Sequence, residues 1–270
     1  MRLNEHIGRS LVCSQSSNTN CGSVALSTSK VLLVPYSEHH VPTYHEWMQD
    51  EVCFCIRETY SENMPSNTGV QELQQATASE PLTMPEEYDM QKSWRTDGDK
   101  LTFIVCLPVG EDFEKPIRAQ SNDSPDRMIG DVNLFIVEDD EAEDATAAPL
   151  VGEVELMIAR KDLHRSGYGR STLLTFLYYV LSNLPSIVEE HRAPTSHPTG
   201  QMEYLRVKIG NTNERSLALF ESIGFRKVKE EPNFFGEYEL RLLVTNSAIS
   251  ELAKAKNFEM PTILQYHIKH

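Results

Sequence analysis

The strongest pattern along the chain is an apolar strand, a glycine turn and an apolar helix in direct succession. VELMI at 154–158 predicts a buried strand, HRSGYGRST at 164–172 contains the turn, and LLTFLYYVL at 173–181 predicts a buried helix. Gly167 and Gly169 can adopt positive φ and let the backbone approach a ligand. Because the first N–H groups of a helix lack intrahelical acceptors and lie at its positive end, the turn predicts an anion site. A tight connection that holds no ligand is the alternative interpretation.

The other apolar segments alternate between strand and helix periods. Helices are predicted at 39–48, with Pro42 in the first turn, and at 84–94, where Thr83 and Glu86 complete a capping box. Strands are predicted at 31–36, 100–107, 129–137, 152–158, 204–209 and 238–244, and the last pairs with FRKVKE at 225–230 in a hairpin around NFFGE. The three strands from 100 to 158 are expected to form an antiparallel run. The alternation predicts a mixed α/β fold.

A second motif lies further along the chain. NTNERSLALFESIGFRKV at 211–228 predicts a short helix that begins after Asn213 and ends at Gly224, followed by a strand. The order of strand, glycine turn, helix, strand, Asn-led helix, Gly-Phe and strand resembles the GNAT superfamily of acyl-CoA-dependent N-acyltransferases. That resemblance implies a GNAT-like fold, with a largely antiparallel sheet flanked by helices.

Three N-terminal segments narrow the resemblance. VLLVPYSEHHVPTYHEWM at 31–48, TASEPLTMPEEYDMQKSW at 77–94 and MIGDVNLFI at 128–136 are similar to the N-acetyltransferase 9-like branch of the superfamily. The resemblance covers most of residues 31–244 and is interrupted by several insertions.

The resemblance implies that acetyl-CoA is the co-substrate and that the glycine turn holds its diphosphate. The family's cofactor pattern falls on His164, Arg165, Ser166, Gly167, Tyr168 and Gly169, with His in place of the usual Arg or Gln at the first position, and Arg170 adds a cation. In the family, backbone amides of the preceding strand polarise the thioester carbonyl, which points to Leu156, Met157 and Ile158. Asn213 would bind the pantetheine arm or a water, although it can equally act as a helix N-cap.

Two carboxylates are the candidates for proton transfer. Glu153 and Glu155 are two residues apart on a predicted strand, so their side chains project from the same face about 7 Å apart. One of them is expected to act as general base toward the acceptor amine. The alternative is that both side chains face solvent or form ion pairs with Lys and Arg. Asp131 and Asn133 alternate on the preceding strand and are weaker candidates for the same face.

The general acid has no clear candidate. The superfamily often places a Tyr on the helix after the Asn motif, but the matching position is Phe220, which cannot donate a proton. Tyr178, Tyr179, Tyr238 or water would have to protonate the departing thiolate. Because a thiol has a pKa of about 8.5, the thiolate leaves readily even without a dedicated acid.

Composition and charge limit the partners. The chain has 270 residues, 40% of them hydrophobic, and a net charge of −15. The acidity argues against a nucleic-acid partner and favours a cationic amine or a basic peptide. No run of 18 apolar residues predicts a membrane span, and the N-terminus has no secretory h-region, so a cytoplasmic location is expected.

We expect one domain at 31–244. Residues 1–30 are predicted to be a mostly irregular extension, 51–71 and 183–201 to be insertions, the second of them a surface loop, and 245–270 to be a tail that begins as a helix. Cys13, Cys21, Cys53 and Cys55 fall in the irregular segments, whereas Cys106 is predicted to be a core residue. No metal site is expected, because the CFC at 53–55 and His39, His40 and His45 lack the spacing of a zinc site.

The resemblance therefore implies an N-acetyltransferase that moves an acetyl group directly from acetyl-CoA to an amine, which we expect to belong to a protein or peptide. An acetyl-CoA-binding or catalytically inactive interaction module, with microtubule-related partners suggested by the resembling branch, is one alternative. A small-molecule amine acetyltransferase is the other.

Overall fold

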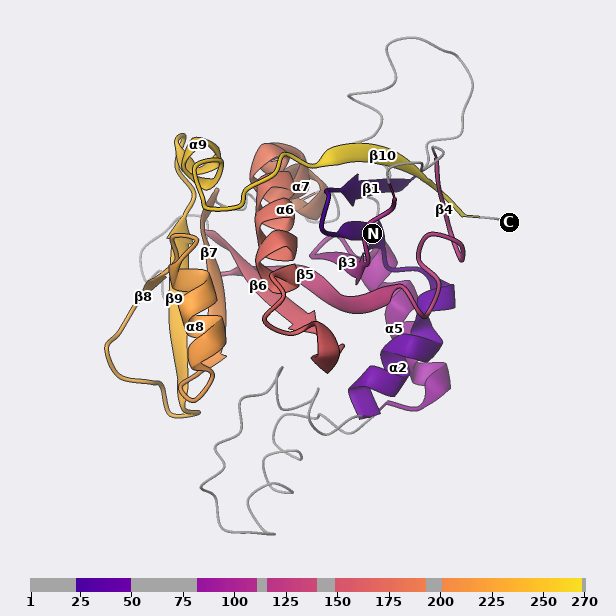
Figure 1. Ribbon diagram of the computed structural model, residues 1–270. Helices are drawn as coiled ribbons and strands as arrows, with labels where there is room; N and C mark the ends of the chain where they lie inside the picture. Colours follow the sequence, from indigo (N-terminus) through magenta and orange to yellow (C-terminus); the bar gives the residue numbers. More distant parts are fainter. Residues whose placement is uncertain (1–22, 50–81, 111–115, 140–148, 193–200, 269–270) are drawn as a thin grey trace, which may run out of the picture.

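A ten-stranded sheet organises the chain (Figure 1). The computed structural model describes residues 23–49, 82–110, 116–139, 149–192 and 201–268. The strand order is β4-β10-β1-β2-β3-β5-β6-β7-β9-β8, and neighbours are antiparallel except for the pairs β6–β7 and β10–β4. The strands are β1 Ser23–Ser27, β2 Leu32–Pro35, β3 Lys100–Cys106, β4 Ile117–Arg118, β5 Met128–Glu138, β6 Leu150–Ile158, β7 Met202–Gly210, β8 Arg226–Lys227, β9 Glu237–Leu243 and β10 Thr262–His267.

Helices cover both faces of the sheet. They are α2 Val41–Gln49, preceded by the 3₁₀ turn η1 Glu38–His40; α5 Met84–Thr96; α6 Tyr168–Ser182, preceded by η2 Lys161–Leu163; α7 Leu184–Arg192; α8 Glu214–Glu221; and α9 Ala248–Leu252. The predicted fold class, the antiparallel run β3–β5–β6 and the capping box of Thr83 and Glu86 are confirmed.

Strand β3 shows why the two faces differ. Its side chains alternate, so Phe103 packs with α6 while Ile104 packs on the face that α2 and α5 cover. The ring of Phe103 meets Phe176 and Tyr179 of α6 edge-on, at centroid distances of 6.1 and 5.7 Å. Aromatic pairs of this geometry stabilise a core beyond the area they bury. These contacts fix α6 against the middle of the sheet.

The sheet extends beyond the predicted bounds of 31–244. Residues 23–27, predicted as part of an irregular extension, form β1, and the tail contributes both α9 and β10. β1 and β10 pair with each other along their length, from Ser23↔Tyr266 to Ser27↔Thr262. The expectation of irregular structure is therefore wrong for residues 23–27, whereas α9 confirms that the tail begins as a helix; the strand β10 after it was not predicted.

The predicted surface loop at 183–201 is also wrong in its first half. Residues 184–192 form α7, whose Ile187 and Val188 are buried in the core. Pro185 lies in the first turn, where a helix tolerates proline because that N–H has no intrahelical acceptor. The predicted insertion at 51–71 and Cys13, Cys21, Cys53 and Cys55 lie outside the described residues. Cys106 is fully buried, as predicted.

The parallel pair β6–β7, in the middle of the sheet, is incomplete. The ladder between β6 and β7 runs from Leu150↔Met202 to Glu153↔Arg206 and then stops. β6 nevertheless continues to Ile158 against β5, and β7 continues to Gly210 against β9. The two strands diverge, so backbone groups of β6 beyond Glu153 face an opening.

Among the described helices none is long and apolar enough alone to cross a membrane; α6 and α7 pass that test only as a pair, bent by 69°.

Candidate active site

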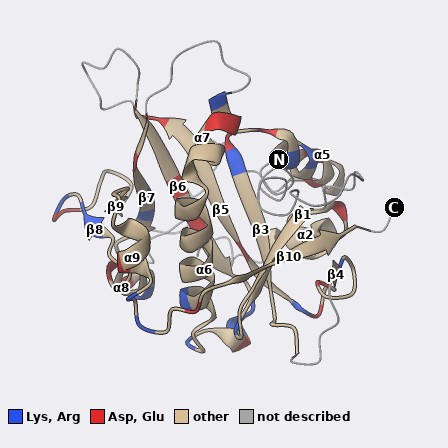
Figure 2. Ribbon diagram, turned by 90° about the horizontal axis from the view of Figure 1, so that it is seen from above, with Lys and Arg blue, Asp and Glu red and all other residues tan. Residues whose placement is uncertain are grey.

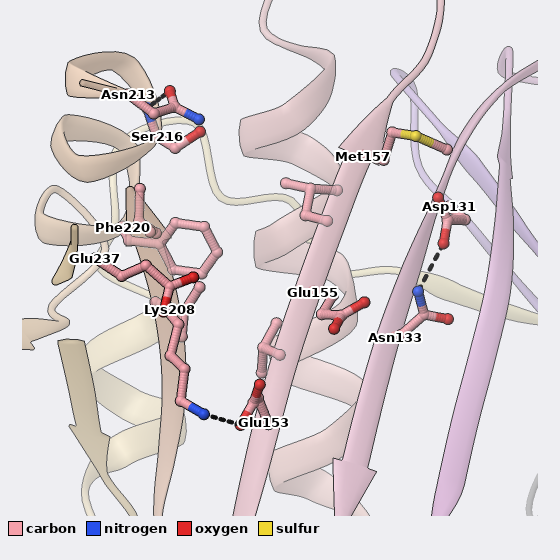
Figure 3. A pocket seen from close by; sticks show the side chains of 14 residues that line it. Asp131, Asn133, Glu153, Glu155, Met157, Lys208, Asn213, Ser216, Phe220 and Glu237 are labelled. Atoms are coloured by element: carbon pink, nitrogen blue, oxygen red, sulfur yellow. Dashed lines mark hydrogen bonds and ion pairs between the residues drawn. The ribbon is translucent and has the colours of Figure 1, made fainter. Parts of the chain in front are cut away.

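The divergence of β6 and β7 forms a hollow of about 140 Å³ (Figure 3). Residues of β5 and β6 line it on one side, and residues of β7, β9 and α8 line it on the other. The lining includes Asp131, Asn133, Glu153, Glu155, Leu156, Met157, Lys208, Asn213, Ser216, Phe220 and Glu237. The predicted residues of β6 and the predicted Asn213 thus come together at one place, although 60 residues of sequence separate Glu153 from Asn213.

Glu153 is held by two cations at the closed end of the opening. Arg206 Nε donates to Glu153 Oε2 at 2.8 Å, and Lys208 Nζ lies 3.5 Å from the same oxygen. Arg206 is the register partner of Glu153, so the ion pair lies where the β6–β7 ladder ends. For Glu153 the alternative interpretation of the sequence holds: its carboxylate forms ion pairs with Arg and Lys. Both cations engage this carboxylate, which fixes it at the closed end of the opening.

Glu155 lies further into the opening and is partly buried. It faces Asn133, its register partner on β5, and the neighbouring Asp131 accepts a 2.6 Å hydrogen bond from Asn133 Nδ2. In Figure 3 the carboxylate of Glu155 points toward these β5 side chains. Asp131 and Asn133 are only 2% and 1% exposed. Glu155 is therefore the carboxylate of β6 that lies beside the buried Asn133.

The glycine turn has the geometry of an anion cradle. Gly167 precedes α6 with φ 86°, in the left-handed region, and a Cβ added there would meet nothing within 4 Å. Arg165 also has a positive φ of 62°, and Arg165 and Ser166 are exposed. A Cβ added to Gly169 would lie at ordinary contact distance from the side chains of Leu156 and Ile158 of β6. The first turn of α6 therefore presents its N–H groups to open space at the wide end of the opening.

Two predicted phosphate ligands of this turn have other partners. His164 Nε2 donates to the carbonyl of Ile158 at 2.7 Å, which ties the turn to the end of β6. Arg170 donates from Nε to the carbonyl of Lys256 at 2.9 Å and from Nη1 to Ser222 Oγ at 2.6 Å. Tyr168, the first residue of α6, has the ammonium of Lys30 over its ring. In this structure the guanidinium of Arg170 joins α6 to two other segments.

Asn213 acts as a helix N-cap, which is one of the two roles that the sequence allowed. Its Oδ1 accepts a hydrogen bond from Ser216 N at 3.1 Å, which makes it the N-cap of α8. Its amide nitrogen stays on the side of the opening (Figure 3). Phe220 is 3% exposed and packs edge-on against Phe225. Tyr178, Tyr179 and Tyr238 do not line the hollow.

Lys208, Ser216 and Glu237 are lining residues that sequence reasoning missed. Lys208 alternates with Arg206 along β7, so a polar i, i+2 pair on a strand could have indicated it. Ser216 lies one helical turn before Phe220 and therefore on the same face of α8. No local signal in the sequence indicated Glu237, because it reaches the opening through the pairing of β9 with β7, in which it lies opposite Gly210.

A buried cluster away from the opening contains the atoms of a metal site. His39 Nε2 and His40 Nε2 lie 3.1 and 2.9 Å from Asp123 Oδ2, and Tyr266 OH donates to the same oxygen. However, Ser37 N–H donates to His40 Nδ1 at 3.0 Å, so neutral His40 carries its proton on Nε2 and donates it to Asp123. The nitrogen that faces the cluster is thus a donor, which does not suit a metal ligand. The cluster fits a hydrogen-bonded joint between η1, the loop before β5 and β10.

Burial and hydrogen bonding determine the charge of His40 and Asp123 in this joint. Burial lowers the pKa of His40 to about 4, against the opposing effect of its hydrogen bond to Asp123. Burial alone would raise the pKa of Asp123, but the hydrogen bonds from His39, His40 and Tyr266 outweigh it and hold that pKa well below its usual range. A neutral His40 and an ionised Asp123 are the resulting states at neutral pH.

Sequence comparison assigns the class of protein that this fold and opening define. Residues 30–226 match the family described as "Acetyltransferase (GNAT) domain". The match covers well over half of the chain, and the chain therefore belongs to the GNAT family of N-acetyltransferases. Members of this family use acetyl-CoA.

Relatives and one solved structure agree with this assignment. An N-acetyltransferase 9-like protein of Schizosaccharomyces pombe is 37% identical over 254 residues, which cover 86% of this chain and 98% of that protein. The human alpha/beta-tubulin-N-acetyltransferase 9 is 36% identical over 219 residues, covering 81% and 82%. Mycobacterium smegmatis RimJ in complex with CoA-disulfide has a TM-score of 0.51 at 11% identity, covering 87% of this chain and 95% of that chain, and shows the fold.

The described residues fit a bound coenzyme A. The open space in front of Gly167 would receive a diphosphate, and the unpaired edge of β6 would receive the pantetheine arm, beside Asn213. Arg165 is exposed at the turn and can neutralise phosphate charge.

Proposed function

We propose that this N-acetyltransferase transfers the acetyl group of acetyl-CoA directly to an amino group of a protein or peptide. The names of the human, mouse and fly relatives suggest tubulin as the acceptor. The observation that carries the proposal is the charge of the opening: besides Glu153, which forms ion pairs with Arg206 and Lys208, the carboxylates of Asp131, Glu155 and Glu237 line it. Such a lining attracts a cationic amine.

Glu155 is the general base in this proposal. The acceptor amine must lose a proton as its nitrogen bonds to the acyl carbon and the carbon–sulfur bond breaks. Glu155 lies in the opening beside buried Asn133, whereas Glu153 is occupied by Arg206 and Lys208. Glu153 instead fixes the closed end of the opening and the position of Lys208. N–H groups of β6 beyond Glu153 would donate to the acyl oxygen as negative charge develops there.

The proton for the departing thiolate comes from water or from the Ser216 hydroxyl. Phe220 occupies the place where the family often has Tyr, and its ring has no proton to give. Ser216 lies one turn earlier on the same face of α8 and also lines the hollow. Since a thiol has a pKa of about 8.5, either donor is sufficient at neutral pH.

The test compares Glu155→Gln with Glu153→Gln in the full-length chain. Acetyl-CoA binding is measured by calorimetry, and acetyl transfer is measured on tubulin, on peptides of its N-terminus and on polyamines. We expect Glu155→Gln to lose about 100-fold or more in kcat with unchanged acetyl-CoA affinity, as general-base removal predicts. Glu153→Gln should retain a larger share of the turnover and lose thermal stability instead.

Three results would contradict the proposal. Retention of full turnover by Glu155→Gln would exclude that residue as the base. Tubulin binding without acetyl transfer by wild-type protein that binds acetyl-CoA would favour an interaction module. Faster acetylation of polyamines than of any protein or peptide would favour a small-molecule acetyltransferase.

A further inference from the structure

The positive charge at the glycine turn has fewer sources than the sequence suggests. The diphosphate and the 3′-phosphate of coenzyme A bring several negative charges, while the chain itself has a net charge of −15. Of the two arginines in the turn, Arg170 already bonds Ser222 and the carbonyl of Lys256. Arg165 remains exposed. Because exposed charges are screened beyond about 8–10 Å, cations that aid phosphate binding must lie close to the turn.

The C-terminal segment brings the backbone of Lys256 beside the guanidinium of Arg170, a residue of the first turn of α6. Arg170 donates to the backbone of Lys256, and two residues later Phe258 packs on Tyr178 at a ring distance of 5.6 Å. These two contacts fix the segment along α6, and Figure 1 shows it crossing α6 between α9 and β10. The Lys256 side chain is exposed, and within the described part of the chain it has no ion-pair partner.

The turn between β1 and β2 brings a second cation. Lys30 Nζ lies 4.5 Å from the ring centroid of Tyr168, the first residue of α6. The turn is attached to the same C-terminal segment, because Ser29 donates from both its N–H and its hydroxyl to the carboxylate of Glu259. Two segments from opposite ends of the sequence are thereby joined beside the anion cradle. In the view of Figure 2, α6 lies between α8 and α9 on one side and β1 and β10 on the other.

We propose that Lys30 and Lys256 bind the phosphate groups of coenzyme A and complete the donor site. The inference rests on the proposed function, since it assumes that the cradle of α6 holds the donor. Lys256 is outside residues 30–226 that match the family, and Lys30 is at the boundary of that match. The two lysines take the part that the sequence assigned to Arg170, while Arg170 positions the segment that carries Lys256.

The test measures binding rather than turnover. Dissociation constants of coenzyme A and of dephospho-coenzyme A, which lacks the 3′-phosphate, are determined by calorimetry at several salt concentrations. The proteins are wild type, Lys30→Gln, Lys256→Gln, Lys256→Arg and Lys92→Gln. Lys92 is an exposed lysine of α5, on the other face of the sheet, so its variant removes the same charge far from the cradle.

We expect Lys30→Gln and Lys256→Gln each to weaken coenzyme A binding about three- to tenfold at low salt, the range for a charge-assisted contact at a partly exposed site. Their salt dependence should be shallower than that of the wild type. Lys256→Arg should keep wild-type affinity, and Lys92→Gln should do the same. A lysine that contacts the 3′-phosphate should lose its effect with dephospho-coenzyme A, whereas one that contacts the diphosphate should keep it.

The failure of this inference and the failure of the proposed function give different results. If the wild type binds coenzyme A and both Gln variants match Lys92→Gln in affinity and salt dependence, the lysines do not bind phosphate. If the wild type does not bind coenzyme A, the donor site itself is wrong and so is the inference that rests on it. A loss of affinity in Lys30→Gln that is accompanied by a lower melting temperature and an unchanged salt dependence would assign Lys30 a structural role against Tyr168.

Discussion

The buried joint around Asp123 makes stability depend on the charge of His40. His40 is fully buried, accepts a hydrogen bond from Ser37 N–H and donates one to Asp123. A proton added to Nδ1 would face the Ser37 N–H group and would place a cation where no water can solvate it. We therefore expect mild acidification to lower the free energy of unfolding.

The magnitude follows from the two pKa values. Burial lowers the pKa of His40 from 6.5 to about 4, so between these values the unfolded chain binds more protons than the folded chain. Stability consequently falls as the pH is lowered through this window. The shift corresponds to about 3 kcal/mol in total, of which about 2 kcal/mol is lost between pH 7 and pH 5.

Urea unfolding at pH 7, 6 and 5 measures this loss in the wild type and in His40→Gln. The variant is less stable at pH 7, because Gln cannot reproduce both hydrogen bonds, but it has no proton to gain at this position. Its stability should therefore change by about 2 kcal/mol less over the window. Equal changes in the two proteins, or a wild type that is most stable at pH 5, would refute the reasoning.

Three further outcomes follow from the fold. Gly130→Ala should cost at least about 2 kcal/mol in urea unfolding, because the new Cβ would lie 2.0 Å from the carbonyl oxygen of Met157; wild-type stability would contradict the register of β5 and β6. Asn213→Ala should lose about 1 kcal/mol of stability through the lost cap, while Asn213→Asp restores it. Cys106 should resist a thiol reagent until the chain unfolds, since it is buried and burial raises its thiol pKa well above the usual range. The labelling rate is measured in a variant with the other four cysteines replaced by Ser. Rapid labelling of that folded variant would argue against the burial.

Turns and helix ends that depend on neighbouring residues could be predicted from the sequence. The turn at Gly167 and the capping box at Thr83 depend on residues within a few positions, so both were predicted. The SVALS of β1 carries no such signal, because its strand exists through pairing with β10. Residues 184–192 do not form the predicted loop: the proline and histidine content of 183–201 favours a loop, but Pro185 lies in the first turn of α7, where a helix tolerates it.

The site shows the same division between local and distant determinants. Glu153, Glu155 and Asn213 were predicted to line one site, and all three line the opening. The sequence could not tell the two glutamates apart, since the difference lies in Arg206, a residue of another strand. It also assigned Arg170 to a ligand, because the competing acceptors on Ser222 and Lys256 are distant in sequence.

The pairing of β1 with β10 has a consequence for folding. The partner strand β10 lies more than 230 residues after β1 in the sequence, so during synthesis this edge of β1 stays unpaired until residues 262–267 have left the ribosome. Contacts between such distant segments also slow folding, because a long loop must close before they form. Shortening the chain before Thr262 would leave that edge exposed permanently and should make the protein prone to aggregation.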